Sequence, residues 1–389
     1  MIREIILKKG KESSLLRKHP WVFSGAIVTD FSSFLDGECV RVFSKDGAYL
    51  GTGHFQHGSI AVRILTFEEE FIEQGFWDKR VQRMVNLRET LGLLSSEGIC
   101  RLCHGEGDEI PGLILDYYNG VVVLQCHSAG MLNHLTEITN ALKTSLGKRF
   151  RALYHKSSDT LPKRLDIKDG YLYGTCQTPH IAIEDGIKYA IDWETGQKTG
   201  FFIDQRDNRS LLGKMSRGKT VLNAFCYSGG FSLQALKNDA KMVYSLDSSP
   251  KAIGLTERNL ELNQFKDRHV SVIADAMEFL KSLPEPFDII ILDPPAFAKH
   301  LDKKHKAVQG YKRLNAHALR QIKPGGILFT FSCSQVIDKD LFQHTIVAAS
   351  IESGRNVKIL HQLHQPADHP IGAFHPEGEY LKGLVLYVE

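Results

Sequence analysis

The second half of this chain alternates short apolar runs with longer amphipathic segments. The runs fit buried strands. Segments such as 250–263 and 309–322 fit helices, because their apolar residues recur every three or four positions. Strands that alternate with helices pair in parallel and carry helices on both faces of the sheet. We therefore predict an α/β domain with a mostly parallel sheet over residues 184–389. Its strands are expected at residues 220–224, 242–246, 269–273, 288–292 and 327–331.

The first half of the chain shows two other sequence patterns, which predict two further domains. Short β-rich runs separated by glycines predict a small β domain over residues 1–72. A central α+β domain is expected over 73–183, with a helix near its start and another over 131–146. Between these helices, Asn119 and Gly120 separate two apolar runs and predict a β-hairpin.

Length and composition exclude several classes of protein. With 389 residues the chain is too long for one ordinary core. A net charge of +3 implies no general coating by nucleic acid, so any basic patch must be local. No apolar run approaches the roughly 20 residues that cross a bilayer, and residues 1–11 lack a signal-peptide core, so we expect no membrane association. Seven cysteines in such a chain predict reduced thiols and a cytoplasmic location.

One cysteine pattern suggests a cofactor that other features argue against. Cys100, Cys103 and His104 have the spacing of covalent haem attachment, which requires export. A zinc site needs a second Cys/His pair at ligand spacing, and none is evident. We therefore expect two structural cysteines and no metal.

Three predicted strand ends carry residues that suit a nucleoside-type cofactor. The loop after the first strand contains Gly229 and Gly230, which let a ligand approach the backbone at a helix N-terminus. This loop lacks the dinucleotide-binding glycine pattern. Asp247 would either accept hydrogen bonds from ribose hydroxyls or cap the next helix. After the third strand, Asp275 can reach an adenine amine. Together these positions predict the cofactor more specifically than any one of them alone.

The next two strand ends carry a carboxylate and a thiol. Asp293 ends one predicted strand, and Cys333, flanked by Ser332 and Ser334, follows the next. The carboxyl ends of parallel strands meet at one edge of a sheet, so Asp293 and Cys333 should face the same crevice. That pairing suits chemistry on a flat, electron-poor ring. The alternative for Cys333 is a small buried residue at the end of a strand.

The order of these motifs resembles the class I S-adenosylmethionine-dependent methyltransferases. More closely, it resembles the RlmI-type 23S ribosomal RNA large-subunit cytosine-C5 methyltransferases, over the whole chain. The similar segments are 19–27, 105–113, 199–206, 367–370 and 376–378. The resemblance implies an N-terminal RNA-binding PUA domain, a Rossmann-like domain with a seven-stranded sheet, and S-adenosylmethionine as cofactor.

The same resemblance implies a set of cofactor contacts. Where such families often carry Asp, this chain has Asn223, which puts a charge-based role there in doubt. Cys226 lies in the cofactor loop and is expected to pack beside the methyl donor rather than attack a base. The implied contacts are Gln205, Arg206, Asn223, Phe225, Tyr227, Ser228, Gly229, Asp247, Asp275, Ala276 and Asp293.

For cytosine C5, the chemistry assigns Cys333 and Asp293 as catalytic residues. Carbon 5 is a poor nucleophile, but a thiolate that adds to C6 makes C5 able to take a methyl group. A free thiol titrates near about 8.5, so the site should lower the pKa of Cys333. Asp293 would support protonation of N3 during the attack. No residue is identified as the base that removes the C5 proton.

Two alternatives to this function remain open. Asp-Pro-Pro followed by an aromatic residue also resembles the motif that methylates exocyclic amines, which would make the protein an RNA or protein amine N-methyltransferase without use of Cys333. Two-cysteine cytosine-C5 enzymes carry a Cys where this chain has Ala296, so only one thiol is expected here. A non-catalytic RNA-binding assembly factor is the third candidate.

A basic segment after Phe297 is expected to hold RNA phosphates around a displaced base, or else to be a solvated loop. Residues 299–313 carry six Lys or Arg against one Asp. The expected partner is 23S ribosomal RNA, free or in an assembling large subunit, and a homodimer is one possibility. The expected substrate contacts are Pro294, Pro295, Phe297, Lys299, Lys303, Lys304 and Tyr311.

Overall fold

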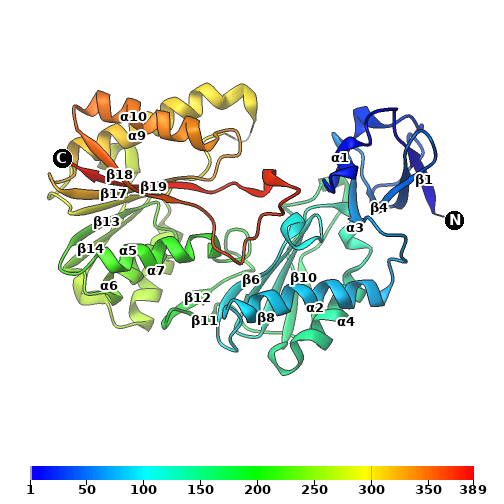
Figure 1. The fold of residues 1–389 in the computed structure, drawn as a ribbon. Helices are drawn as coiled ribbons and strands as arrows, with labels where there is room; N and C mark the ends of the chain where they lie inside the picture. Colours follow the sequence, from blue (N-terminus) through cyan, green and yellow to red (C-terminus); the bar gives the residue numbers. More distant parts are fainter. Residues whose placement is uncertain (1, 299) are drawn as a thin grey trace. The chain divides into compact units, whose positions relative to one another are not determined.

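The computed structural model describes residues 2–298 and 300–389, and the chain divides into two compact units (Figure 1). The first unit comprises Met1–Ile183, Ile191–Ile203 and Ala367–Gly378. The second comprises Glu184–Ala190, Asp204–Pro366 and Glu379–Glu389. Lys299, one of the expected RNA contacts, lies outside the described residues.

The first unit begins with a five-stranded sheet in the order β1-β3-β4-β5-β2, as predicted for the small β domain. β1 pairs with β3 in parallel, and the other neighbours are antiparallel. Ile5, Val40 and Val62 are fully buried in its core. Gly53 is required because a Cβ there would overlap the carbonyl of Arg63 on the next strand. The elements are β1 (Arg3–Ile6), α1 (Ser13–Leu16), β2 (Trp21–Phe23), β3 (Cys39–Phe43), β4 (Tyr49–Phe55) and β5 (Ile60–Thr66).

A second five-stranded sheet, in the order β10-β9-β8-β7-β6, carries helices α2 and α4, which lie against each other (Figure 1). The predicted hairpin is confirmed, with Asn119 and Gly120 joining β7 to β8 at φ 42° and 86°. Cys100 and Cys103 are fully buried on β6. The elements are α2 (Gln74–Thr90), β6 (Ile99–His104), β7 (Leu113–Tyr118), β8 (Val121–Cys126), α3 (Ala129–Leu132), α4 (Leu135–Leu146), β9 (Ala152–His155) and β10 (Gly170–Tyr173).

The prediction of one helix over 131–146 is wrong, because two helices, α3 and α4, occupy this region. The break falls at Asn133 and His134, whose side chains are held by the first sheet. Asn133 donates to the carbonyl of Gly37 over 2.8 Å, and the ring of His134 bonds and stacks with that of His54. Tertiary contacts therefore override the helical periodicity of the sequence at this point.

The second unit is built on a seven-stranded sheet in the order β15-β14-β13-β16-β17-β19-β18. The first five strands in this order are parallel, and β19 runs antiparallel between β17 and β18. The order reverses between β13 and β16, where ligands bind in open α/β sheets. The strands are β13 (Thr220–Ala224), β14 (Met242–Asp247), β15 (His269–Ile273), β16 (Ile289–Leu292), β17 (Gly326–Ser332), β18 (Val357–Leu363) and β19 (Lys382–Val388).

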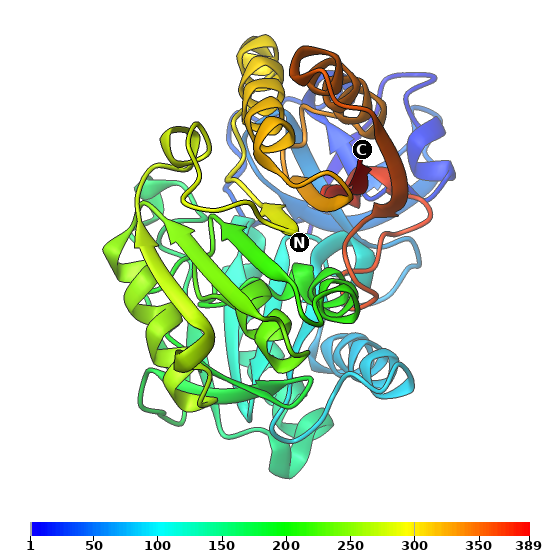
Figure 2. The same cartoon turned by 90° about the vertical axis from the view of Figure 1, so that its left-hand side faces the viewer.

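Helices cover both faces of this sheet, which confirms the predicted α/β class (Figure 1). α5, α6 and α7 lie on one face, and α9 and α10 lie side by side on the other (Figure 2). A two-stranded sheet of β11 and β12 precedes the domain. The remaining elements are β11 (His180–Glu184), β12 (Ile187–Ile191), α5 (Arg206–Met215), α6 (Gly230–Lys237), α7 (Pro250–Leu262), α8 (Ala276–Phe279), α9 (Lys304–Gln321) and α10 (Lys339–Ser353).

Helix α9 corrects one expectation. It begins at Lys304 rather than at residue 309, so most of the basic segment is the start of a helix and not a loop. Ala307 is fully buried beneath this first turn, and Val308 also packs on the core. The apolar face of the helix therefore extends further towards its N-terminus than the sequence pattern predicted.

Two segments expected in the third domain pack with the first unit instead. Thr199 donates its hydroxyl to the buried Asp116 over 2.6 Å, and Asp368 accepts the backbone N–H of Arg101 over 2.9 Å. These bonds explain why the segments 191–203 and 367–378 belong to the first unit. The proposed boundary between residues 72 and 73 stays a prediction.

Candidate active site

The loop between β13 and α6 has an unusual backbone. Phe225 and Tyr227 have φ angles of 62° and 47°, although neither is glycine, and Gly229 has φ 76°. Such left-handed conformations cost about 1–3 kcal/mol each and cluster at ligand sites. Gly229 is also required by packing, because a Cβ there would lie 2.7 Å from Thr256 Cγ2. The glycine is therefore explained by the neighbouring helix α7 and not only by the approach of a ligand.

Asp247, at the end of β14, holds this loop in place. One carboxylate oxygen accepts the backbone N–H of Tyr227 over 3.1 Å, and the other accepts that of Ser249 over 2.9 Å. Ser249, rather than Asp247, caps α7 by accepting the N–H of Ala252. A carboxylate at this strand end, oriented by two backbone amides, can accept hydrogen bonds from a ribose.

Asn223 is buried at the end of β13 and differs in chemistry from the Asp that its position often carries. Its amide nitrogen donates to Ser232 Oγ over 2.9 Å, whereas a carboxylate could only accept a hydrogen bond from that hydroxyl. Its Oδ1 has no hydrogen-bond partner among the residues that the structure describes. A buried acceptor of this kind at the cofactor edge fits a site that a polar ligand completes.

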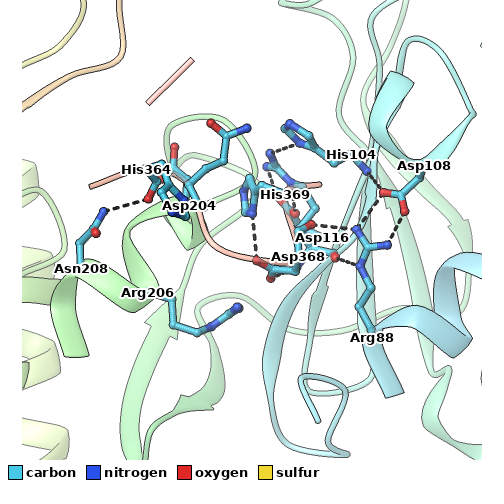
Figure 3. A network of polar contacts seen from close by, with 12 residues as sticks. Arg88, His104, Asp108, Asp116, Asp204, Arg206, Asn208, His364, Asp368 and His369 are labelled. Carbon is cyan, nitrogen blue, oxygen red and sulfur yellow. Dashed lines mark hydrogen bonds and ion pairs between the residues drawn. The ribbon is translucent and has the colours of Figure 1, made fainter. Parts of the chain in front are cut away.

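The other expected cofactor contacts lie at helix starts within the same unit. Asp275 caps α8 by accepting the N–H of Glu278 over 3.0 Å, and Ala276 is buried behind it. Gln205 accepts from Asn208 over 2.7 Å, and Figure 3 shows Asn208 directed at the backbone of His364.

Arg206 is buried on α5 beside a second arginine. Its Nε lies 3.4 Å from Glu184 Oε2, while Arg209 donates to Glu184 Oε1 over 2.9 Å. A single carboxylate thus serves two buried guanidinium groups. A guanidinium group at the start of α5 can pair with the carboxylate of a ligand.

Asp293 and Cys333 follow neighbouring parallel strands, as predicted. β16 and β17 pair in register with Leu292 opposite Thr330; Asp293 directly follows Leu292, and Cys333 follows the end of β17 at Ser332. Ser334 donates its hydroxyl to the carbonyl of Ala298 over 2.7 Å, which joins the loop after β16 to the loop after β17. Asp293 and Cys333 are both partly buried.

Phe297 packs against helix α9. Its ring centroid lies 4.5 Å from that of Tyr311, and a Cβ on Gly310 would lie 2.9 Å from the Phe297 ring. One side of the Phe297 ring therefore packs against the protein core. Pro294 is buried and Pro295 is exposed at the same loop.

Tyr311 does not lie on the surface as a substrate contact would. Its side chain is fully buried between Phe297 and Phe342, and contact with RNA would require it to leave the core. Burial raises the pKa of Tyr311 to about 12, and negative charge on Cys333 and Asp293 acts in the same direction. Tyr311 therefore stays neutral beside both site residues.

Two of the expected lysine contacts, Lys303 and Lys304, are accessible. Lys303 is exposed just before α9, and Lys304, at the first position of α9, lies 3.8 Å from Asp338. An ion pair of this kind at the surface contributes little to the free energy of unfolding. The ammonium group of Lys304 can therefore exchange Asp338 for another partner.

Cys226 is a poor nucleophile in this environment. Its thiol is buried in the loop after β13, 3.7 Å from Thr256 Oγ1, and burial raises its pKa to about 12. At neutral pH it is protonated, as expected for a cysteine that packs and does not attack.

Lys382 lies at the same edge of the sheet as Cys333, although no sequence pattern indicated it. It is the first residue of β19, is 6% exposed, and lies opposite Ser332 in the antiparallel ladder. Its Nζ donates to the carbonyl of Ser334 over 2.8 Å. The pairing joins positions 50 residues apart, and no local motif predicts it.

In the first unit, the segment at Asp368 is held by a buried charge network (Figure 3). Arg88 donates to Asp108 over 2.8 Å and to the carbonyl of Asp368 over 2.8 Å. Arg101 pairs with Asp116 over 2.8 Å. These contacts give the segment 367–370 a structural role within this unit.

Family models match most of the chain. Residues 5–67 match a PUA-like domain, and residues 101–375 match the S-adenosylmethionine-dependent methyltransferases. None of the helices in the described part of the chain has the length and apolar character needed to span a bilayer.

Full-length relatives are similar throughout. The chain is 39% identical to "Ribosomal RNA large subunit methyltransferase I" of Aeromonas hydrophila subsp. hydrophila and 41% identical to the protein of that name from Shewanella amazonensis, with 99% of each chain covered in both cases. Two solved structures share the fold at 22% identity and 100% coverage of each chain. One, from Streptococcus mutans, is assigned as a SAM-dependent methyltransferase (TM-score 0.85), and the other was solved with SAH (TM-score 0.86).

Proposed function

Because this chain belongs to the S-adenosylmethionine-dependent methyltransferase family, we propose that it methylates C5 of a cytosine in large-subunit (23S) ribosomal RNA. The RNA class follows the names of its full-length relatives. The observation that carries the C5 assignment is the pairing of Asp293 and Cys333 at neighbouring strand ends, in loops that the bond from Ser334 to Ala298 joins.

S-adenosylmethionine is the cofactor, and the residues at this edge of the sheet fit it. Asp247 would accept from the ribose hydroxyls, Asp275 would lie towards the adenine, and Arg206 would face the carboxylate. Asn223 Oδ1 offers a buried acceptor. When bound, the cofactor supplies an electrophilic methyl group on a sulfonium.

Cys333 would attack the target base as a thiolate. Its Sγ forms a bond to C6, and the electron pair of the C5–C6 double bond moves towards N3, where Asp293 supports protonation. Carbon 5 would then take the methyl group, whose bond to the sulfonium sulfur breaks. Loss of the C5 proton and of the Sγ–C6 bond restores the aromatic ring and frees the enzyme.

The packing of Phe297 disfavours the amine alternative. An exocyclic amine methyltransferase uses the aromatic residue after Asp-Pro-Pro to stack on the base. Here one side of Phe297 is taken by Tyr311 and Gly310. The C5 proposal requires no stacking by Phe297, because the covalent bond to Cys333 holds the base.

Contacts to the surrounding RNA would come from two places. Lys303 and the exposed part of the basic segment offer mobile ammonium groups for phosphates. The PUA-like domain would add a second RNA-binding surface. Lys299, which belongs to the same segment, remains part of this proposal.

Mass spectrometry of ribosomal RNA tests the function. Cells without the gene should lack one 5-methylcytidine of the large subunit, and expression of the wild-type protein or of Cys176→Ala should restore it. Cys176 is also partly buried but lies in the first unit. Cys333→Ala should not restore the mark.

Other results would redirect the proposal. Loss of an N-methylated nucleotide, restored by Cys333→Ala, would support the amine methyltransferase. No change in any nucleotide, together with no binding of S-adenosylmethionine, would support the assembly factor.

A further inference from the structure

Lys382 places a positive charge inside the candidate site. Its ammonium group is bonded to the carbonyl of Ser334, one residue beyond Cys333, and its backbone lies opposite Ser332, one residue before. These two contacts, with the residues on either side of Cys333, place Lys382 next to Cys333. With 6% of its surface exposed, the ammonium group is largely removed from water.

A buried ammonium group is costly unless a negative charge compensates it. Among the described residues no carboxylate forms an ion pair with Lys382, and its hydrogen-bond acceptor is a neutral carbonyl. Burial lowers the pKa of Lys382, and negative charge on Cys333, then Glu379 and Asp338, opposes this shift. Cys333 is therefore the strongest of its charge partners, once that thiol is ionised.

Two described groups near Cys333 disfavour ionisation of its thiol. Asp293 is a carboxylate at the same sheet edge, and Tyr311 is a neutral phenol that faces both residues. Like charge raises the pKa of a thiol, and a nearby cation lowers it. Lys382 supplies a positive charge at this edge, and that charge favours the thiolate.

We propose that Lys382 is a positioning residue that holds Cys333 as a thiolate ready for nucleophilic attack. The Cys333 proton passes to solvent water, and the ammonium group of Lys382 stabilises the sulfur anion without itself losing a proton. The use of this thiolate to attack C6 rests on the proposed function. The ionisation of Cys333 is a property of the protein without RNA.

Alkylation of the full-length protein by iodoacetamide over a series of pH values measures this ionisation, because only the thiolate reacts. Mass spectrometry of the peptide that contains Cys333 gives its rate separately from the other cysteines. In the wild-type protein the Cys333 reaction should have a midpoint below the ordinary value of about 8.5. A midpoint at or above that value overturns the proposal without use of any variant.

Lys382→Met should raise the midpoint by about one pH unit, which lowers the Cys333 alkylation rate about tenfold at neutral pH. Lys382→Arg keeps the charge and should retain most of the reactivity. Lys358→Met is the matched control, since Lys358 lies on the neighbouring strand β18 and pairs with Glu389. Thermal unfolding and binding of S-adenosylmethionine show whether each variant is folded. An unchanged midpoint in folded Lys382→Met overturns the proposal.

A single-turnover reaction with ribosomal RNA separates this role from that of a base for the C5 proton. A positioning residue acts before the covalent bond forms, so Lys382→Met should form the protein–RNA adduct more slowly. Accumulation of adduct in that variant would instead identify Lys382 as the base and reject the positioning role. The Cys333 alkylation midpoint could be low while the protein forms no 5-methylcytidine. That result would support the role of Lys382 in ionising Cys333 and would reject the proposed function.

Discussion

Ser334 donates its hydroxyl hydrogen to the carbonyl oxygen of Ala298 over 2.7 Å, and both residues are buried. This bond joins the loop after β16, which carries Asp293, to the loop after β17, which carries Cys333. Chain connectivity alone leaves the spacing of two such loops free. The bond therefore restricts how far the two loops, and the site residues that they carry, can move apart.

Replacement of Ser334 by Ala should lower methyl transfer about 10- to 100-fold, because displacement of a reacting group by about 1 Å costs roughly that much. The free energy of unfolding should fall by only about 1 kcal/mol, the ordinary value of one such hydrogen bond. Ser216→Ala is a matched control. It removes another buried hydroxyl, one bonded to the carbonyl of Leu212 over 2.7 Å, and should keep full activity. Equal activity of the two variants would show that the Ser334 bond has no role in positioning.

Asp247→Asn should weaken the binding of S-adenosylmethionine at least tenfold in isothermal titration calorimetry. The amide has one acceptor oxygen instead of two, so it can no longer hold both Tyr227 and Ser249 and still face a ribose. Asp239→Asn, on an exposed residue paired with Arg217, should leave the affinity as it is. Unchanged affinity in Asp247→Asn would mean that the cofactor does not use this strand end.

Gly310→Ala should lower both stability and activity, because its new methyl group would lie 2.9 Å from the ring of Phe297. We expect a loss of about 1–3 kcal/mol in the free energy of unfolding, typical of overpacking. Gly254→Ala provides the contrast, since nothing lies within 4 Å of a Cβ in the middle of α7. That variant should be more stable by up to about 1 kcal/mol. Urea denaturation measures both values, and a stabilised Gly310→Ala would contradict the packing described for Phe297.

Acid should destabilise the first unit through His54. Burial, with the nearby His134, lowers the pKa of His54 to about 3 in the folded state, against 6.5 for the free side chain. Between these values the unfolded chain binds more protons, so stability is lost as the pH falls below 6.5. Each such histidine contributes up to about 1.4 kcal/mol per pH unit within this window.

His54→Gln should therefore reduce the pH dependence of the free energy of unfolding near pH 5 by about one proton. His127, whose pKa burial lowers to about 4, continues to contribute, as do other histidines of this unit with lowered pKa values, such as His104 and His155. Urea titrations of the wild-type protein and the variant at several pH values give the two slopes. Identical slopes would show that His54 is protonated in the folded protein or does not titrate in the window.

The sheet of the second unit could be predicted well from the sequence, because buried parallel strands are short apolar runs with polar ends. β13 and β15 have the predicted bounds, β14 and β16 differ by one residue at one end, and β17 is longer by one residue at each end. β18 has no such pattern. Most of its side chains are exposed, and it lies at the edge of the sheet, so hydrophobicity does not mark it.

The site could be predicted in part for a related reason. Asp293 and Cys333 follow strands that are consecutive in the sequence, so the parallel rule brings their positions together. Lys382 comes from a strand that turns back between two others, and its contact with Ser334 depends on antiparallel register. The burial of Tyr311 could not be predicted, because Lys312 and Arg313 follow it in the sequence while its own side chain faces the core.

The insertion of β19 between β17 and β18 also constrains how the second unit can assemble. β18 has β19 as its neighbour in the sheet, so residues 357–363 have no strand to pair with until residues 382–388 are in place. The same late strand delivers the ammonium group of Lys382 next to Cys333. Under the proposed mechanism, activation of Cys333 and closure of the sheet would occur together, and a partly folded chain would carry a thiol of ordinary pKa.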